Sequence, residues 1–134
     1  MMRSKNPMLF AKVAIGMTAA IWIGFALWLG INPQALLIAF GVEQSTPPML
    51  TEIRAFYGGV ELAIAACMLL LMRSGLYRPA LLIGGLPLLG SSAFRCIGSF
   101  VDGFSGLHLA MAGIEFGGFL FCLAAYSQLD QQPT

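Results

Sequence analysis

Four charged side chains stand inside apolar stretches of this chain, where a membrane-spanning helix seldom carries charge: they are Arg54, Glu61, Arg95 and Glu115. A charge near the middle of a spanning helix costs about 2.5–3.5 kcal/mol on insertion scales, so such residues usually pair with one another or serve a function. Arg54 and Glu61 are seven residues apart, almost two α-helical turns, which predicts that they share one helix face. His108 and Glu115 repeat that spacing.

Two arginines and two glutamates suit either of two kinds of site. Arginine stays protonated and grips a carboxylate through two hydrogen bonds, so the four residues fit a closed salt-bridge network that fixes which helix faces meet. They also fit a ligand pocket, in which the glutamates accept hydrogen bonds or protons and the arginines neutralise them or hold an anionic headgroup. Ser92 adds a hydroxyl to either site. The residues predicted to bind a ligand or to form a buried polar network are Arg54, Tyr57, Glu61, Ser91, Arg95, His108 and Glu115.

Other site chemistries have less support in the sequence. His108, Asp102 and the two glutamates include hard metal ligands, but no helix carries the Glu-x-x-His spacing of di-iron bundles, so we predict no metal and no cofactor. No nucleophile elbow and no phosphate-binding glycine loop is present, so we assign no catalytic residue. Cys67, Cys96 and Cys122 lack CxxC spacing and are expected to be small buried apolar side chains.

The composition indicates that the solvent of this chain is lipid. Of its 134 residues, 58% are hydrophobic and 10% are charged, and the mean hydropathy is +0.83. These values are far from those of soluble domains, so the expected partner is the lipid bilayer. A net charge of +1, without a basic stripe interleaved with aromatic residues, gives no reason to expect nucleic acid.

We predict an all-α fold, an integral membrane antiparallel four-helix bundle that forms a single domain over 1–134. The spans are expected at about 9–30, 50–72, 79–99 and 107–126. The segment 31–48 has an apolar core too short to cross a bilayer. It is therefore predicted to be an outer loop with a short surface or re-entrant helix that ends near Gly41.

Lysine and arginine fall on one side of these spans. The side that holds both termini carries Arg3, Lys5, Lys12, Arg73 and Arg78, and the opposite loops carry none. Cytoplasmic loops are enriched in these residues, so both termini are expected to be cytoplasmic. The basic start is similar to a signal peptide, but the apolar run after it is long and Pro33 stands where a small residue should precede cleavage, so we expect a retained first span.

This topology places the four charges at similar depths, in the outer half of the membrane. Consecutive or spaced glycines give flat helix surfaces that let helices approach closely, and we favour plain helix packing as their role. They are Gly58-Gly59, Gly84-Gly85 and Gly113-x-x-x-Gly117. The sequence thus predicts a polar cluster from three helices that meet inside the bilayer.

The octapeptide Glu52-Ile53-Arg54-Ala55-Phe56-Tyr57-Gly58-Gly59, followed by Arg95, Asp102-Gly103 and Glu115, resembles a widespread family of small bacterial four-helix membrane proteins classed only as a domain of unknown function. The likeness spans most of the chain. More distantly, the architecture is similar to the DoxX-like four-helix membrane proteins, some of which are linked to quinone or thiol redox systems. The resemblance implies a four-helix fold in the bacterial inner (plasma) membrane, and the family carries no established activity.

The leading functional hypothesis is a non-enzymatic membrane protein that binds a small hydrophobic or lipid-like molecule, or that serves as an accessory subunit in a homo-oligomer or beside a partner membrane subunit. One alternative is a proton-coupled small transporter, which would need an oligomer because four spans are few for one chain. A second alternative is a membrane redox helper for quinones or thiols, in which Cys96, beside Arg95, is the reactive thiol.

Overall fold

The computed structural model describes residues 6–130, so Arg3 and Lys5 lie outside it. Within that range every regular element is a helix, and four apolar stretches are long enough to cross a bilayer. The predicted all-α fold with four long apolar helices is confirmed. In chain order the elements are α1 (Pro7–Ile31), α2 (Gln34–Ala39), α3 (Pro47–Ile53), the π-helix η1 (Arg54–Val60), α4 (Glu61–Arg73), α5 (Tyr77–Val101) and α6 (Gly106–Asp130).

The four long helices match the thickness of a membrane. Because α3, η1 and α4 are continuous, the second long helix is Pro47–Arg73, and the four candidates have between 24 and 27 residues. About 20 apolar residues are enough to cross the hydrocarbon core of a bilayer. Large apolar side chains such as Phe94, Phe100 and Ile114 are exposed on the outside of the molecule, where lipid would surround them. The chain is therefore a small multi-pass membrane protein.

Glycines end two of the helices with the same hydrogen-bond pattern. After α4, Gly75 takes a φ of 76°, and the N–H groups of Gly75 and Leu76 donate to carbonyls in the last turn of the helix. After α2, Gly41 takes a φ of 73° and the N–H groups at 41 and 42 do the same. Left-handed backbone suits glycine, so each glycine allows a tight reversal while satisfying helix-end carbonyls.

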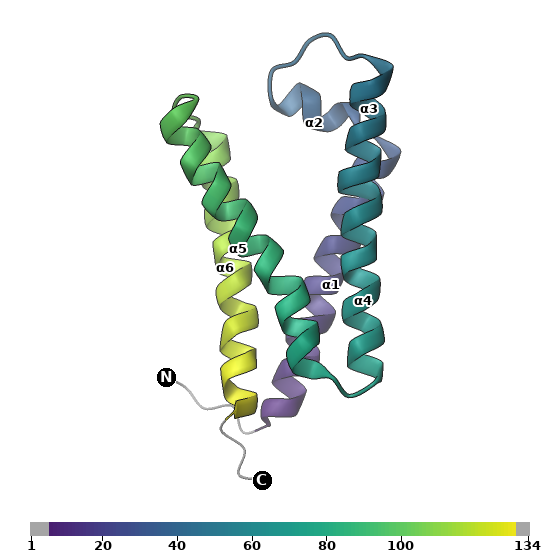
Figure 1. Cartoon of the computed structure of the whole chain (residues 1–134), viewed down its shortest axis with the longest axis vertical. Helices are drawn as coiled ribbons and strands as arrows, with labels where there is room; N and C mark the ends of the chain where they lie inside the picture. The colour runs from purple at the N-terminus through teal and green to yellow at the C-terminus, as the bar shows by residue number, and fades with distance from the viewer. Residues whose placement is uncertain (1–5, 131–134) are drawn as a thin grey trace.

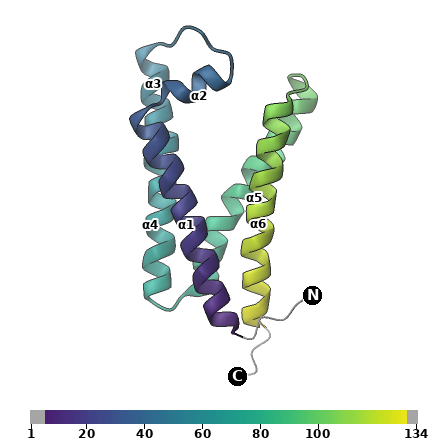
Figure 2. The same cartoon turned by 180° about the vertical axis from the view of Figure 1, so that it is seen from behind.

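The long helices form a V made of two pairs (Figure 1). In the α1–α4 pair, α1 packs along η1 and α4, and in the α5–α6 pair those two helices pack along each other more extensively than any other elements. The pairs meet at the end of the molecule where α1 begins and α6 ends, which we call the terminus end. They diverge toward the end that carries α2, which we call the α2 end (Figure 2).

The buried core follows the same division. At the terminus end, residues from all four long helices pack together around Ile15, Met68 and Leu81, which are fully buried. At the α2 end, the buried cluster is built from α1, α2 and α3. A hydrogen bond of 3.3 Å from Trp22 Nε1 to the Gly84 carbonyl ties α1 to α5 about halfway along. The buried core shared by the two pairs thus lies in the half of the molecule nearer the termini.

Candidate functional site

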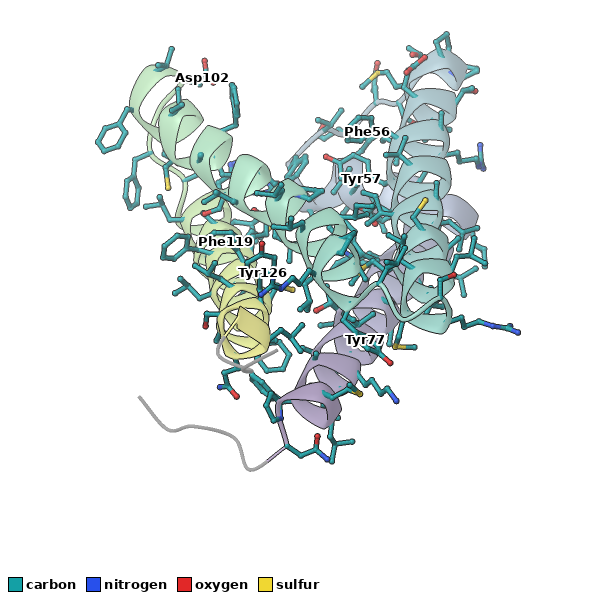
Figure 3. All side chains as sticks on the ribbon, turned by 60° about the horizontal axis from the view of Figure 1, so that its bottom comes forward. Phe56, Tyr57, Tyr77, Asp102, Phe119 and Tyr126 are labelled. Atoms are coloured by element: carbon teal, nitrogen blue, oxygen red, sulfur yellow. The ribbon has the colours of Figure 1, made fainter. Side chains whose placement is uncertain are left out.

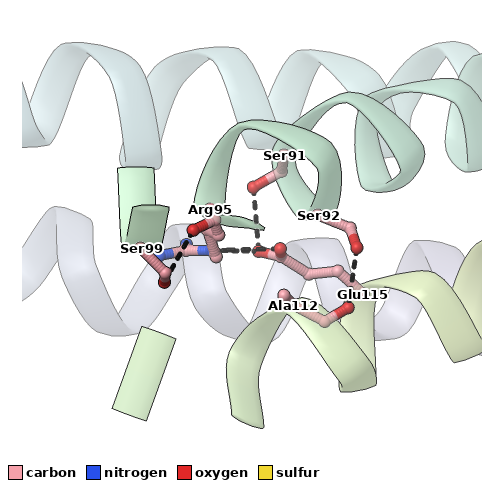
Figure 4. A network of polar contacts seen from close by, with 6 residues as sticks. All are labelled: Ser91, Ser92, Arg95, Ser99, Ala112 and Glu115. Atoms are coloured by element: carbon pink, nitrogen blue, oxygen red, sulfur yellow. Dashed lines mark hydrogen bonds and ion pairs between the residues drawn. The ribbon is translucent and has the colours of Figure 1, made fainter. Parts of the chain in front are cut away.

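An ion pair joins α5 to α6 between their midpoints and the α2 end (Figure 4). Arg95 Nε lies 3.0 Å from each carboxylate oxygen of Glu115. Ser91, one turn earlier on α5, donates its hydroxyl to Glu115 Oε1 at 2.9 Å. The side chains of Arg95 and Glu115 are only 14% and 16% exposed. The Glu115 carboxylate is therefore fully engaged by α5.

Two further serines anchor the same stretch of α5 to carbonyl oxygens. Ser92 Oγ donates to the Ala112 carbonyl of α6 at 2.9 Å, and Ser99 Oγ donates to the Arg95 carbonyl of its own helix at 2.9 Å (Figure 4). The helices approach closely because small residues line the contact: a Cβ added to Gly118 would lie 2.9 Å from Leu88 Cδ1. Close approach through small residues is typical of membrane helix pairs.

Glu61 faces this ion pair from the other helix pair. It begins α4, and it interacts electrostatically with both Glu115 and Arg95. Its Oε2 atom is buried, and among the residues that the structure describes it is the one buried side-chain oxygen or nitrogen without a hydrogen-bond partner. Leaving such an atom unpaired costs about 1–3 kcal/mol. Glu61 thus presents an unsatisfied acceptor at the place where the two pairs of helices separate.

Arg54 does not join these three residues. Its side chain is exposed, and its Nε donates to the Gly30 carbonyl at 3.3 Å. Gly30 lies in the last turn of α1, where carbonyl groups have no partner within the helix and a positive charge is favourable. Arg54 therefore acts at the end of α1, and the predicted meeting of all four charged groups is reduced to Glu61, Arg95 and Glu115.

The π-helix η1 explains why Arg54 and Glu61 diverge. Seven residues make almost two turns of an α-helix, but η1 covers Arg54–Val60 and has i→i+5 hydrogen bonds, which put more residues in each turn. The seven-residue spacing then no longer returns to the same face. Gly58 and Gly59 fall in this segment, and glycine weakens regular helix in its interior.

Tyr57 and His108 lie on the α2-end side of Glu61 and Glu115, and both contact side chains at that end. Tyr57 is partly buried against the cluster at that end, which includes Leu36, and Figure 3 shows it between the Pro47–Arg73 helix and α5 in that view. The His108 ring, at the start of α6, contacts the Phe40 ring with centroids 5.0 Å apart. Phe40 follows α2, so this ring contact links the two diverging pairs at their open end.

The glycine surfaces divide into packed and unpacked ones. A Cβ on Gly58 would lie 3.2 Å from the Gly30 Cα, and one on Gly85 would lie 3.0 Å from Cys122 Cβ, so both glycines are at close crossings. Gly113 and Gly117 have nothing within 4 Å of such an atom.

The three cysteines differ in their exposure, since Cys122 is buried, Cys96 is half-buried and Cys67 is exposed.

No metal site accompanies the ion pair: within residues 6–130, no group of three or more His, Cys, Asp or Glu side chains is placed to hold a metal ion. A small apolar hollow lies between α5 and α6 nearer the terminus end, against Gly85, Phe119 and Cys122, and has room for no more than about one water molecule. Glu61 and its two charged neighbours offer hydrogen bonding and charge pairing.

Sequence reasoning missed the roles of backbone groups in this region. The Gly30 carbonyl, which receives Arg54, and the Ala112 carbonyl, which receives Ser92, have no signature in side-chain type or spacing. The consecutive glycines at 58 and 59 are the signal that could have indicated an irregular helix before Glu61.

Comparison with known proteins places the chain in a family. No curated protein and no solved structure matches it. A family model described as a domain of unknown function, DUF4345, matches residues 10–126, a range that runs from α1 into α6 and contains all four intramembrane charges. Because the match covers most of the chain, and its helices are those of a small multi-pass membrane protein, the chain belongs to the DUF4345 family.

Proposed function

We propose that this protein binds a small, largely hydrophobic molecule between its two helix pairs and that Glu61 is the polar anchor for it. The observation that carries the proposal is the buried Glu61 Oε2 atom, which has no hydrogen-bond partner although Arg95 and Glu115 are close enough to interact with its charge. A polar group inside a membrane that stays unpaired costs free energy, and ionisable residues there commonly mark a binding site or a transport path.

The neighbouring ion pair supports a binding role for Glu61 over a purely structural one. A closed network would use each charge to satisfy another, as Arg95 and Ser91 do for Glu115. Glu61 stands outside that set of hydrogen bonds, on the opposite helix pair. A ligand group that donates a hydrogen bond to Glu61, or that places a positive charge beside it, would compensate the carboxyl group, and the apolar remainder would lie among side chains that already face lipid.

The binding proposal is tested by thermal stability of the purified protein in lipid nanodiscs. The panel contains long-chain alcohols, hydrophobic amines and quinones, each compared in the wild type, in Glu61→Gln and in Glu52→Gln. A ligand at 100 times its Kd stabilises a protein by about 2.7 kcal/mol, which raises the Tm by several degrees. We expect such a rise in the wild type with at least one class of compound, its loss in Glu61→Gln, and its retention in Glu52→Gln.

Glu52 is the matched control because it is a glutamate of the same long helix whose side chain is exposed. A wild-type Tm that no compound changes would overturn the proposal, as would stabilisation that is the same in Glu61→Gln. Either result would favour a structural role instead. The protein would then be a helix assembly held by ion pairs that serves as an accessory subunit.

We further propose that the terminus end faces the cytoplasm of a bacterial cell. Lys12, Arg73 and Arg78 all belong to that end, and the loops of the α2 end contain neither lysine nor arginine. Two of these cations also lie over tyrosine rings: Lys12 over Tyr77, 5.7 Å from the centroid, and Arg78 over Tyr126, 5.4 Å from the centroid. Tyrosine and basic side chains at one end of the spans suit a membrane interface.

Single cysteines in a variant without Cys67, Cys96 and Cys122 test this orientation. Thr46→Cys and Ser74→Cys place exposed thiols in loops at opposite ends. A membrane-impermeant maleimide added to intact cells should label position 46 and leave position 74 unlabelled until the membrane is permeabilised. The reverse pattern would overturn the orientation.

A further inference from the structure

Glu61, Arg95 and Glu115 supply two carboxyl groups and one guanidinium, so an ionised Glu61 leaves this group of side chains one positive charge short. Arg95 and Glu115 cancel, since Arg95 Nε is 3.0 Å from both carboxylate oxygens. The second arginine of the sequence, Arg54, cannot offset Glu61 from its position at the Gly30 carbonyl. Glu61 therefore has no cation of its own, although it lies in a medium where an uncompensated charge is costly.

We infer that the molecule that binds here carries a positive charge, so that the site takes lipophilic cations such as hydrophobic amines and onium ions. This inference rests on the proposed binding function and names its ligand class. A cation beside Glu61 would favour the ionised carboxylate and offset its charge, whereas an anion would be repelled by it and a neutral molecule would offset no charge. Inside a low-dielectric membrane these differences are larger than in water.

The depth of Glu61 indicates a free molecule as the source of the cation, not the headgroup of a bilayer lipid. Glu61 stands near the middle of the 27-residue helix Pro47–Arg73, about 20 Å from its first residue at 1.5 Å per residue. The hydrocarbon core of a bilayer is about 30 Å thick, so headgroups lie about 15 Å from its midplane. A lipid amine bound covalently to its headgroup phosphate would have to bring that phosphate into hydrocarbon to reach Glu61.

The helix turn before Glu61 adds aromatic surface that suits a cation. Tyr57 precedes Glu61 by one turn of this helix, and its ring packs edge-to-face with that of Phe56 at a centroid distance of 5.6 Å. Aromatic faces attract ammonium and related cations, most strongly where water is excluded. A lipophilic cation held by Glu61 would therefore lie about one helix turn from these two aromatic residues.

The test compares three aromatic probes of different charge: tetraphenylphosphonium and tetraphenylborate, which have nearly equal shape, and the smaller neutral triphenylmethanol, whose hydroxyl can donate a hydrogen bond. Each is titrated into the wild-type protein in nanodiscs and into Glu61→Gln, Glu52→Gln and the double variant Glu61→Gln/Glu115→Gln. Affinities are compared between variants for one probe at a time, so that differences in partitioning into lipid cancel. Empty nanodiscs give the background.

The affinity of each probe is expected to follow the charge of the site in each variant. Glu61→Gln should bind tetraphenylphosphonium about tenfold more weakly than the wild type, or worse, while Glu52→Gln should bind it equally well. In the double variant Arg95 has no carboxylate partner, so tetraphenylborate should bind more tightly than it does to the wild type. Circular dichroism and gel filtration establish that each variant is folded before it is titrated.

Two results would overturn the inference. The first is tetraphenylphosphonium affinity that is unchanged in a folded Glu61→Gln. The second is Glu61-dependent binding of triphenylmethanol without Glu61-dependent binding of the phosphonium, which would retain the binding function and reject the charge of its ligand. Absence of binding by all three probes to the wild type, together with a flat result in the wider panel, would reject both.

Discussion

Arg95 on α5 places its Nε at equal distances, 3.0 Å, from the two carboxylate oxygens of Glu115 on α6. The pair crosses the most extensively packed helix interface of the molecule and lies within it, largely hidden from the outside. It fixes one helix against its neighbour, and it leaves Glu61 on the facing helix pair without a counterion.

Removing Arg95 should destabilise the protein more than removing both partners. Arg95→Gln leaves the Glu115 charge uncompensated, and breaking a buried pair in this way costs about 3–5 kcal/mol; the partial exposure here lowers the expectation to about 2–3 kcal/mol. Arg95→Gln/Glu115→Gln replaces both charges with amides that can bond to each other. Unfolding in detergent should show a double variant more stable than Arg95→Gln, and strictly additive losses would contradict a direct pair.

Ser91→Ala should cost about 1–2 kcal/mol because it removes a hydrogen bond to the charged Glu115. Ser99→Ala is the matched control: it also removes a serine hydroxyl from α5, but one that donates to a carbonyl of its own helix. Its effect should stay within about 0.5 kcal/mol. Chemical unfolding of the two variants under one condition gives the comparison, and equal losses would mean that Ser91 contributes no more than a helix-surface serine.

Gly58→Ala and Gly59→Ala should have opposite effects although the residues are adjacent. A Cβ at 58 would stand 3.2 Å from the backbone Cα of Gly30, so the helices must separate, and overpacking of this kind costs about 1–3 kcal/mol. A Cβ at 59 meets nothing within 4 Å, and alanine is favoured over glycine within a helix by about 1 kcal/mol. Thermal unfolding measures both, and a Gly58→Ala protein as stable as the wild type would contradict the close crossing.

Arg54→Gln should leave ligand binding unchanged and reduce stability only slightly. The hydrogen bond of Arg54 to the Gly30 carbonyl is exposed, and a cation near a helix end contributes about 0.3–1 kcal/mol. Titration of this variant with tetraphenylphosphonium should therefore match the wild type. An affinity that fell as much as that of Glu61→Gln would contradict the position of Arg54 at the Gly30 carbonyl, apart from the binding site.

The sequence was sufficient to predict the long helices and a cluster of charged side chains that includes Arg95 and Glu115. Four long apolar runs could be read from hydropathy because a bilayer requires about 20 apolar residues per span, whatever the tertiary structure. Arg95 and Glu115 could be placed in one cluster because they stand at similar depth on helices joined by a short loop. Antiparallel neighbours connected in this way pack together, and opposite charges buried in membrane seek each other.

The position of Arg54 could not be predicted because it depends on two features that the pattern of side chains does not show: an irregular helix and a backbone acceptor. A π-helical segment changes the number of residues per turn, so the seven-residue spacing no longer places Arg54 and Glu61 on the same helix face. The acceptor for Arg54 is a backbone carbonyl at the end of another helix, and every residue has such a group.

The ring contact between Phe40 and His108 has a mechanical consequence for the V-shaped arrangement. Past Gly84, where Trp22 holds it, α5 extends to Val101 as a lever about 25 Å long, so a tilt of about 5° there would displace its tip by about 2 Å. Such a swing would carry α6 along with its partner and pull the histidine ring off the phenylalanine. The contact beside the short helix α2 thus restrains the angle between the two helix pairs. It acts at the α2 end, while the pairs pivot nearer the terminus end.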